Sequence, residues 1–198
     1  MPRTKQRTDE LRHEVLRMAV DLLEADRTAV TARAVAGAAQ TSTAAVYELF
    51  GDKAGLLRAV FYEAFGLLHD ELAAVPVSDD PRGDLVALLA ATRRFAVARP
   101  MLFEVMFARP FAELEPDPTD VAAAAGIMRL VLKAVTRAIG VGVLSGDRRD
   151  IAHVLVAVNR GLISTELAGV AGSSAAKTDR RWQLGIDAVL AGLAPQAA

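Results

Sequence analysis

The periodicity of apolar residues is the feature that most constrains the fold of this chain. Apolar side chains recur about every 3.6 residues through each long segment, and no segment alternates between apolar and polar residues as a half-buried strand does. Alanine is abundant, and it favours helix. The sequence therefore predicts an all-α protein. We expect about nine helices, over residues 9–25, 32–38, 43–50, 53–74, 81–99, 101–108, 119–139, 148–168 and 178–194, with loops at 109–118 and 169–177, the second of them mobile.

Residues that cap helices stand at the beginning of several of these segments. Thr8, Thr31, Asp52 and Asp147 each carry a side-chain oxygen that can accept a hydrogen bond from the free N–H groups of a first helical turn. Gly51 follows the expected helix over 43–50 and can adopt the positive φ that ends many helices. These residues predict helix boundaries independently of the apolar pattern.

The composition excludes several kinds of site. The chain has no cysteine, which excludes disulfides, thiolate nucleophiles and cysteine-bound zinc. No apolar run reaches the roughly 18 residues of a membrane span, and residues 1–10 are too polar for a secretory signal, so we expect a cytoplasmic protein. His13, His69 and His153 show no metal-binding spacing, and no pairing of nucleophile and base indicates an enzyme. We expect neither a metal nor a cofactor.

Charge alone does not indicate a nucleic-acid partner. The net charge is −1, and residues 1–53 carry eight basic and eight acidic side chains. Only residues 1–8 carry charges of a single sign, because Arg3, Lys5 and Arg7 are basic and no acidic residue precedes Asp9. A case for DNA binding must therefore rest on a motif.

Residues 31–53 read TARAVAGAAQTSTAAVYELFGDK and predict two short helices joined by a tight turn, which is the spacing of a helix-turn-helix. Ala36, Ala39 and Ala45 supply the small residues that a close helix crossing needs, and Val46 is an apolar anchor for the core. The alternative interpretation is that two alanine-rich helices pack in a bundle without any further role.

The start of the second short helix carries side chains that suit the edges of DNA bases. The methyl groups of Thr43, Ala44 and Ala45 can contact a thymine methyl, and a threonine hydroxyl can hydrogen-bond to a base or phosphate. Nearby residues suit phosphates, because helix N-termini attract anions and Arg, Lys and Tyr donate hydrogen bonds. The candidate DNA-binding residues are Thr31, Arg33, Ser42, Thr43, Ala44, Ala45, Tyr47 and Lys53.

These residues resemble the DNA-binding signature of the tetracycline-repressor (TetR) family of bacterial regulators. The resemblance lies in the run from Val35 and Ala36 through Ser42 and Thr43, then Ala45, Val46 and Tyr47, Phe50, Lys53, Leu56 and Leu57. It implies a three-helix DNA-binding domain over 1–53 and a larger helical domain over 54–198. The larger domain would hold a ligand and dimerise through the helices at 148–168 and 178–194.

The sequence departs from the family pattern at four positions. Gln40 stands where the family usually has glycine in the turn, and Thr41 where it usually has an apolar residue. Glu48 and Leu49 stand where basic or histidine side chains are common. The second pair removes phosphate contacts, so we expect weaker non-specific DNA binding than is usual for the family.

Aromatic and methionine side chains are concentrated in the helices that would enclose a ligand in this family. Methionine adapts well to apolar pockets, although each of these residues could equally be part of the core. Asn159 could supply a polar anchor, whereas Arg93 and Arg94 suggest a solvated face. The candidate ligand-binding residues are Phe61, Phe65, Met101, Phe103, Met106, Phe107, Met128 and Asn159.

Together these features predict a ligand-responsive transcriptional repressor that binds a palindromic operator as a homodimer and is released by a small apolar effector. The alternative is a helical small-molecule-binding protein without a DNA-binding role, which the neutral charge of residues 1–53 favours. For the dimer, we expect a monomer to leave exposed much of the apolar surface of the last two helices. Those residues are Ile151, Val154, Leu155, Val158, Leu162, Ile163, Trp182, Ile186, Val189, Leu190 and Leu193.

We predict that Glu48→Gln tightens DNA binding at low salt, because its carboxylate would lie near a phosphate and repel it. The gain should shrink as salt screens the charge. Titration of the DNA upstream of the protein's own gene at several salt concentrations measures both effects. Weaker binding by the variant would instead mean that the carboxylate makes a specific contact, such as one to a cytosine amine.

Overall fold

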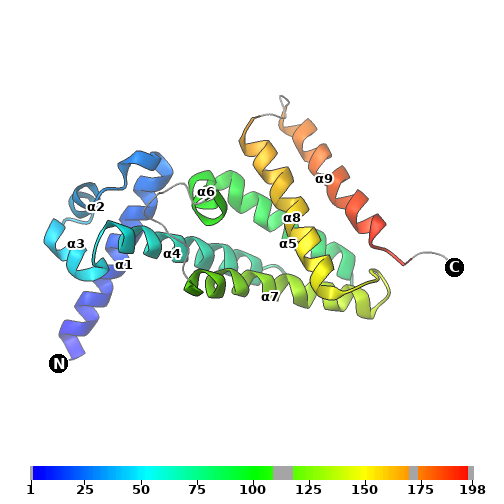
Figure 1. Ribbon diagram of the computed structural model, residues 1–198, viewed down its shortest axis with the longest axis horizontal. Helices are drawn as coiled ribbons and strands as arrows, with labels where there is room; N and C mark the ends of the chain where they lie inside the picture. Colours follow the sequence, from blue (N-terminus) through cyan, green and yellow to red (C-terminus); the bar gives the residue numbers. More distant parts are fainter. Residues whose placement is uncertain (1, 109–117, 170–173, 196–198) are drawn as a thin grey trace. The chain divides into compact units, whose positions relative to one another are not determined.

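The computed structural model describes residues 2–108, 118–169 and 174–195, and over these residues all regular structure is helical (Figure 1). The all-α prediction is confirmed. The α-helices are α1 (Pro2–Ala25), α2 (Ala32–Ala38), α3 (Thr43–Phe50), α4 (Lys53–Ala73), α5 (Pro81–Ala98), α6 (Pro100–Ala108), α7 (Pro118–Gly140), α8 (Arg148–Leu167) and α9 (Ala175–Gly192), with a short 3-10 helix, η1 (Arg27–Ala29), after α1.

The helices form two compact units. Unit 1 comprises Met1–Gly66 and Arg99–Asp120 and contains α1, α2, α3, α6 and the first part of α4. Unit 2 comprises Leu67–Ala98 and Val121–Ala198 and contains α5, α8, α9 and nearly all of α7. No helix of the described chain is long and apolar enough to cross a membrane.

Capping residues define the helix-turn-helix of unit 1 as predicted. The Thr31 hydroxyl accepts a hydrogen bond from Ala34 N–H at 3.2 Å, and the Asp52 carboxylate accepts one from Gly55 N–H at 2.8 Å. Gly51 has a φ of 82°, in the left-handed region where glycine is favoured. Local sequence therefore determines where α2 and α4 begin and where α3 ends.

Two predicted helix starts are wrong by three residues or more, and the other boundaries differ by at most two residues. Thr8 does not cap α1, because the helix already begins at Pro2; proline is tolerated in a first helical turn, and Arg, Lys and Gln favour helix after it. α9 begins at Ala175, within the expected mobile loop, because Ala175 and Ala176 are strong helix formers. The rest of that loop, at 170–173, and the expected loop at 109–117 lie outside the described residues.

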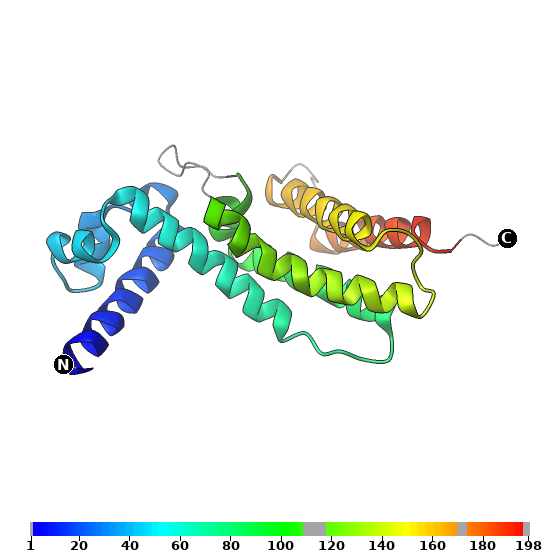
Figure 2. The same ribbon diagram turned by 60° about the horizontal axis from the view of Figure 1, so that its bottom comes forward.

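The core of unit 2 forms where α5, α7, α8 and α9 bury one face each. Leu89, Val135, Leu155 and Ile186 represent the four helices in this cluster, each at most 2% exposed. α8 and α9 run side by side in both views (Figures 1 and 2). Their packing is close at Gly185, since a Cβ atom there would lie 2.9 Å from Leu162 Cδ1.

The turn between α2 and α3 places a non-glycine residue in the left-handed region. Gln40 has a φ of 51°. Its N–H donates to Gly37 O at 3.2 Å, and Thr41 N–H donates to Ala36 O at 2.9 Å, which is the Schellman pattern of helix termination. α7 ends in the same way, but there Gly142 takes the positive φ, at 77°. This geometry explains why glycine would suit position 40.

We predict that Gln40→Gly raises the free energy of unfolding by roughly 0.5–1 kcal/mol. A left-handed conformation costs an L-residue about 1–2 kcal/mol, and the backbone entropy of glycine offsets part of the gain. Thermal or urea unfolding measures the difference. The matched control, Gly142→Ala, adds a Cβ that meets nothing within 4 Å and should destabilise through φ strain alone. A less stable Gln40→Gly protein would show that the glutamine side chain contributes more than its backbone costs.

Candidate functional site

The exposed surface of α3 is the best candidate for a nucleic-acid interface. Val46 is 1% exposed, so one face of this short helix is committed to the core. The opposite face presents Ala44, Tyr47 and Glu48, all of which are exposed, and Tyr47 is 44% exposed. Residues at i, i+3 and i+4 share one side of a helix, so these three form a single outward stripe.

The other α3 candidates lie at its N-terminal end. The Ser42 hydroxyl caps the helix by accepting a hydrogen bond from Ala45 N–H at 3.0 Å. Thr43 and Ala45 are half-buried, so they present less surface than Ala44 does. Ser42 and Ala44 are both exposed, so this end of the helix faces solvent, where its backbone N–H dipoles favour an anion.

The candidate phosphate-binding residues surround the same motif within unit 1. Thr31 and Arg33 are exposed at the start of α2, and Lys53 is exposed as the first residue of α4. Five of the eight candidate residues therefore lie exposed at the starts of α2, α3 and α4, namely Thr31, Arg33, Ser42, Ala44 and Lys53. Tyr47 is exposed farther along α3, and Thr43 and Ala45 are half-buried.

The position of α3 also depends on Arg12 of α1, which the sequence analysis missed. Its guanidinium donates from Nη1 to Leu49 O at 2.9 Å and lies 4.6 Å from the centre of the Phe50 ring. A cation at a helix C-terminus interacts favourably with the helix dipole, and stacking on an aromatic ring adds to this. No local sequence signal connects Arg12 with residues 37 positions away.

The other end of α1 holds the start of α6. Leu102 N–H donates to Glu24 Oε1 at 3.3 Å, so a carboxylate occupies the positive end of the α6 dipole. Burial raises the pKa of Glu24, and the hydrogen bonds from the α6 backbone oppose that shift. α1 is therefore tied by charged side chains both to the recognition motif and to the most apolar helix of the chain.

Several of the candidate ligand-binding residues form one aromatic cluster in unit 1. Ring centres lie 4.9 Å apart for Phe61 and Phe65, 6.1 Å for Phe65 and Phe107, and 4.7 Å for Phe103 and Phe107. Phe61, Phe65, Phe103 and Met106 are buried, whereas Met101 and Phe107 are half-buried. Leu102 and Val105 of α6 are buried as well, so this helix packs into unit 1 on more than one side.

The two remaining candidates lie in unit 2. Met128 of α7 is half-buried against the apolar core of that unit. Asn159 of α8 is 2% exposed, its Nδ2 donates to Leu89 O at 3.1 Å, and its Oδ1 accepts from Trp182 Nε1 at 2.8 Å. The amide of Asn159 thus has partners on α5 and α9. Among the described residues, no group of three or more His, Asp or Glu could hold a metal ion.

A helix-turn-helix with an exposed second helix, joined to a larger helical domain, defines the class of helical DNA-binding regulators. The family model described as "Tetracyclin repressor-like, C-terminal domain" matches residues 85–189, more than half of the chain. The protein therefore belongs to the tetracycline-repressor (TetR) family, as the resemblance in residues 31–53 predicted.

Solved structures share this fold over nearly the whole chain. A protein of unknown function from Rhodococcus sp. RHA1 is 28% identical, with a TM-score of 0.81 and coverage of 93% of this chain and 96% of the other. A TetR family transcription regulator from Marinobacter aquaeolei VT8 is 22% identical, with a TM-score of 0.69 and coverage of 97% and 100%. The TetR family regulator PfmR from Thermus thermophilus is 18% identical, with a TM-score of 0.64 and coverage of 90% and 100%. No curated protein sequence matches the chain.

Proposed function

We propose that this protein is a transcriptional repressor that binds a palindromic operator as a homodimer and is released by a small apolar effector. Residues 1–53 would bind DNA, and residues 54–198 would bind the effector and dimerise. The observation that carries the proposal is the exposed stripe of Ala44, Tyr47 and Glu48 on α3, opposite the buried Val46. A short helix with small residues at its exposed N-terminal end can enter a major groove.

The side chains in and around α3 favour recognition of DNA by direct contact rather than by long-range electrostatic attraction. Thr43, Ala44 and Ala45 would meet base edges, and Thr31, Arg33, Ser42, Tyr47 and Lys53 would contact the backbone. Because residues 1–53 carry balanced charge, the salt-dependent contribution to affinity would be modest. Specific recognition of an operator would then require two DNA-binding domains that bind at the same time.

Two DNA-binding domains that bind successive major grooves need a fixed spacing of roughly 34 Å, which is one turn of DNA. A dimer would supply this spacing. α8 and α9 carry exposed apolar and small residues at helical spacing. Val154 is 42% exposed and Leu184 is 68% exposed, on two helices that pack side by side. Apolar side chains grouped on adjacent helices form a candidate surface for association. We call this surface the α8–α9 face; it comprises Val154, Val158 and Gly161 of α8 and Leu184, Ala188 and Ala191 of α9.

Of the residues of this face, only Val154 and Val158 are among those expected from the sequence. The apolar stripe that was expected to be exposed is largely buried within one protomer, namely Ile151, Leu155, Ile163, Trp182, Ile186 and Leu190. Val158, Leu162, Val189 and Leu193 are half-buried, and Val154 is exposed as predicted. The strongest apolar stripe of each helix packs against its own core, because burial there costs no association entropy.

An apolar effector would bind among the aromatic and methionine side chains of the larger domain, with Phe61, Phe65, Phe103 and Met106 as its main contacts in α4 and α6. Met101 and Phe107 complete this set within unit 1. The sequence also predicts Met128 and Asn159 as contacts, and these two residues lie in unit 2. Effector binding would favour a dimer whose two α3 helices no longer fit successive grooves. Such a shift requires that the effector bind the two states with different affinity.

We predict that Ala44→Glu abolishes binding to the DNA upstream of the protein's own gene and leaves thermal stability nearly unchanged. The new carboxylate would point from an exposed position toward DNA phosphates. A gel-shift titration measures binding, and Ala124→Glu, at an exposed position on α7, is the matched control. An unfolded Ala44→Glu protein would show that position 44 is needed for packing. Failure of the wild-type protein to retard any such fragment would favour the alternative, a small-molecule-binding protein without a DNA-binding role.

We predict that Leu184→Glu yields a folded monomer with at least tenfold weaker operator binding, because a charge in the α8–α9 face opposes its burial. Sedimentation at micromolar concentration measures the association state. Val141→Glu replaces a valine that is 63% exposed outside this face and should leave the dimer intact. A dimeric Leu184→Glu protein would place the interface elsewhere.

A further inference from the structure

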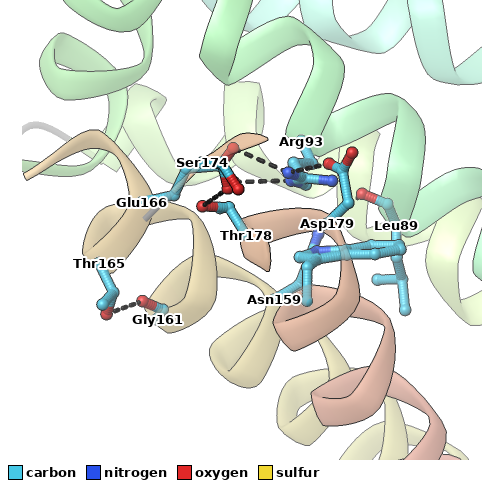
Figure 3. A network of polar contacts seen from close by, with 10 residues as sticks. Leu89, Arg93, Asn159, Gly161, Thr165, Glu166, Ser174, Thr178 and Asp179 are labelled. Carbon is cyan, nitrogen blue, oxygen red and sulfur yellow. Dashed lines mark hydrogen bonds and ion pairs between the residues drawn. The ribbon is translucent and has the colours of Figure 1, made fainter. Parts of the chain in front are cut away.

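Arg93 of α5 joins three helices of unit 2 through a network of charged hydrogen bonds (Figure 3). Its Nε donates to Glu166 Oε2 at 2.6 Å and its Nη2 to Glu166 Oε1 at 2.8 Å, a bidentate pair with α8. Nη2 also donates to Asp179 Oδ1 of α9 at 2.6 Å. The expectation that Arg93 lies on a solvated face is therefore wrong, because one guanidinium serves partners on two other helices.

The two carboxylates differ in their exposure to water. The side chains of Arg93 and Glu166 are 16% and 18% exposed, whereas that of Asp179 is 64% exposed. The pair between α5 and α8 is thus shielded, and loss of either member would leave the other charge poorly solvated and without its main partner. The bond to Asp179 is closer to an ordinary surface ion pair.

A second layer of polar contacts continues from Arg93 into the core. Its guanidinium lies 5.5 Å from the centre of the Trp182 ring, and Trp182 Nε1 donates to Asn159 Oδ1 at 2.8 Å. Asn159 Nδ2 in turn donates to Leu89 O at 3.1 Å. Each helix therefore supplies two anchors, which are Leu89 and Arg93 on α5, Asn159 and Glu166 on α8, and Asp179 and Trp182 on α9.

Two anchors on each helix restrict its rotation as well as its distance from its neighbours. Apolar packing is not directional, so a core alone tolerates small rotations of a helix. Hydrogen bonds and bidentate ion pairs have directional geometry and can specify one arrangement among several of similar apolar burial. In α8 and α9, this rotation decides which residues face outward.

We propose that Arg93 is a positioning residue for self-association, holding α8 and α9 at the rotation that presents the α8–α9 face. This inference rests on the proposed dimer. The network lies on the protomer side of both helices, as the burial of Asn159 and Trp182 shows, while Val154 and Leu184 are exposed. Arg93 thus acts on the interface through the helices and not by contact with a second copy.

The test compares Arg93→Met with Arg94→Met in the full-length protein. Methionine keeps much of the apolar stem and removes the charge, and Arg94 is an exposed neighbour on the same helix. Trp182 is the only tryptophan of the chain, so its fluorescence reports on the network directly. Arg93→Met should shift the emission to longer wavelength and raise the dimer dissociation constant at least tenfold. Arg94→Met should change the constant less than twofold and leave the emission unchanged.

A double variant separates positioning from stability. Arg93→Met with Glu166→Met removes both shielded charges together, which often preserves stability, but it also removes the directional bonds. We expect a folded protein with a wild-type unfolding temperature and a dissociation constant that is still raised at least tenfold. The double variant also tests the proposal if Arg93→Met alone does not fold. A folded variant with altered Trp182 emission but wild-type association would overturn the role of Arg93. A wild-type protein that is monomeric at micromolar concentration would instead contradict the proposed dimer itself.

Discussion

The burial of Val46 is the constraint on which the proposed DNA-binding surface depends. α3 spans only Thr43–Phe50, so one buried anchor determines which face turns outward. Arg12 then holds the C-terminal end of the helix through Leu49 O and the Phe50 ring. Together these contacts leave Ala44 and Tyr47 exposed, because a short helix needs only an apolar side and satisfied ends to keep its orientation.

Helix ends carry much of the remaining organisation of unit 1. Ser42 and Asp52 satisfy backbone N–H groups within their own segments, whereas Glu24 does so for α6, far along the chain. α1 accordingly contacts both the helix that would read DNA and the most apolar helix, α6. In all three cases a polar or charged side chain satisfies a helix end. Ser42 and Asp52 do so for the helix that follows them directly, whereas Glu24 does so for a helix 78 positions away in sequence.

Unit 2 combines a non-directional core with a directional network. Leu155 and Ile186 bury α8 and α9 in the core, and Arg93 with Asn159 restricts how the two helices are rotated. Most of the apolar residues that were expected to form the dimer contact are instead buried within the protomer. What remains for association is the less apolar α8–α9 face, with its small residues and the exposed Leu184.

The sequence by itself determined the helical class, the beginnings of α2, α3, α4 and α8, and the motif in residues 31–53. These features depend on neighbours within about four residues, which periodicity and capping chemistry report. Tertiary structure alone decided that Trp182 faces inward and Leu184 outward, that Asn159 bonds to Leu89, and that Arg93 pairs with Glu166, 73 positions away. An amphipathic pattern shows that a helix has an apolar face, but which partner covers that face depends on contacts between segments distant in sequence.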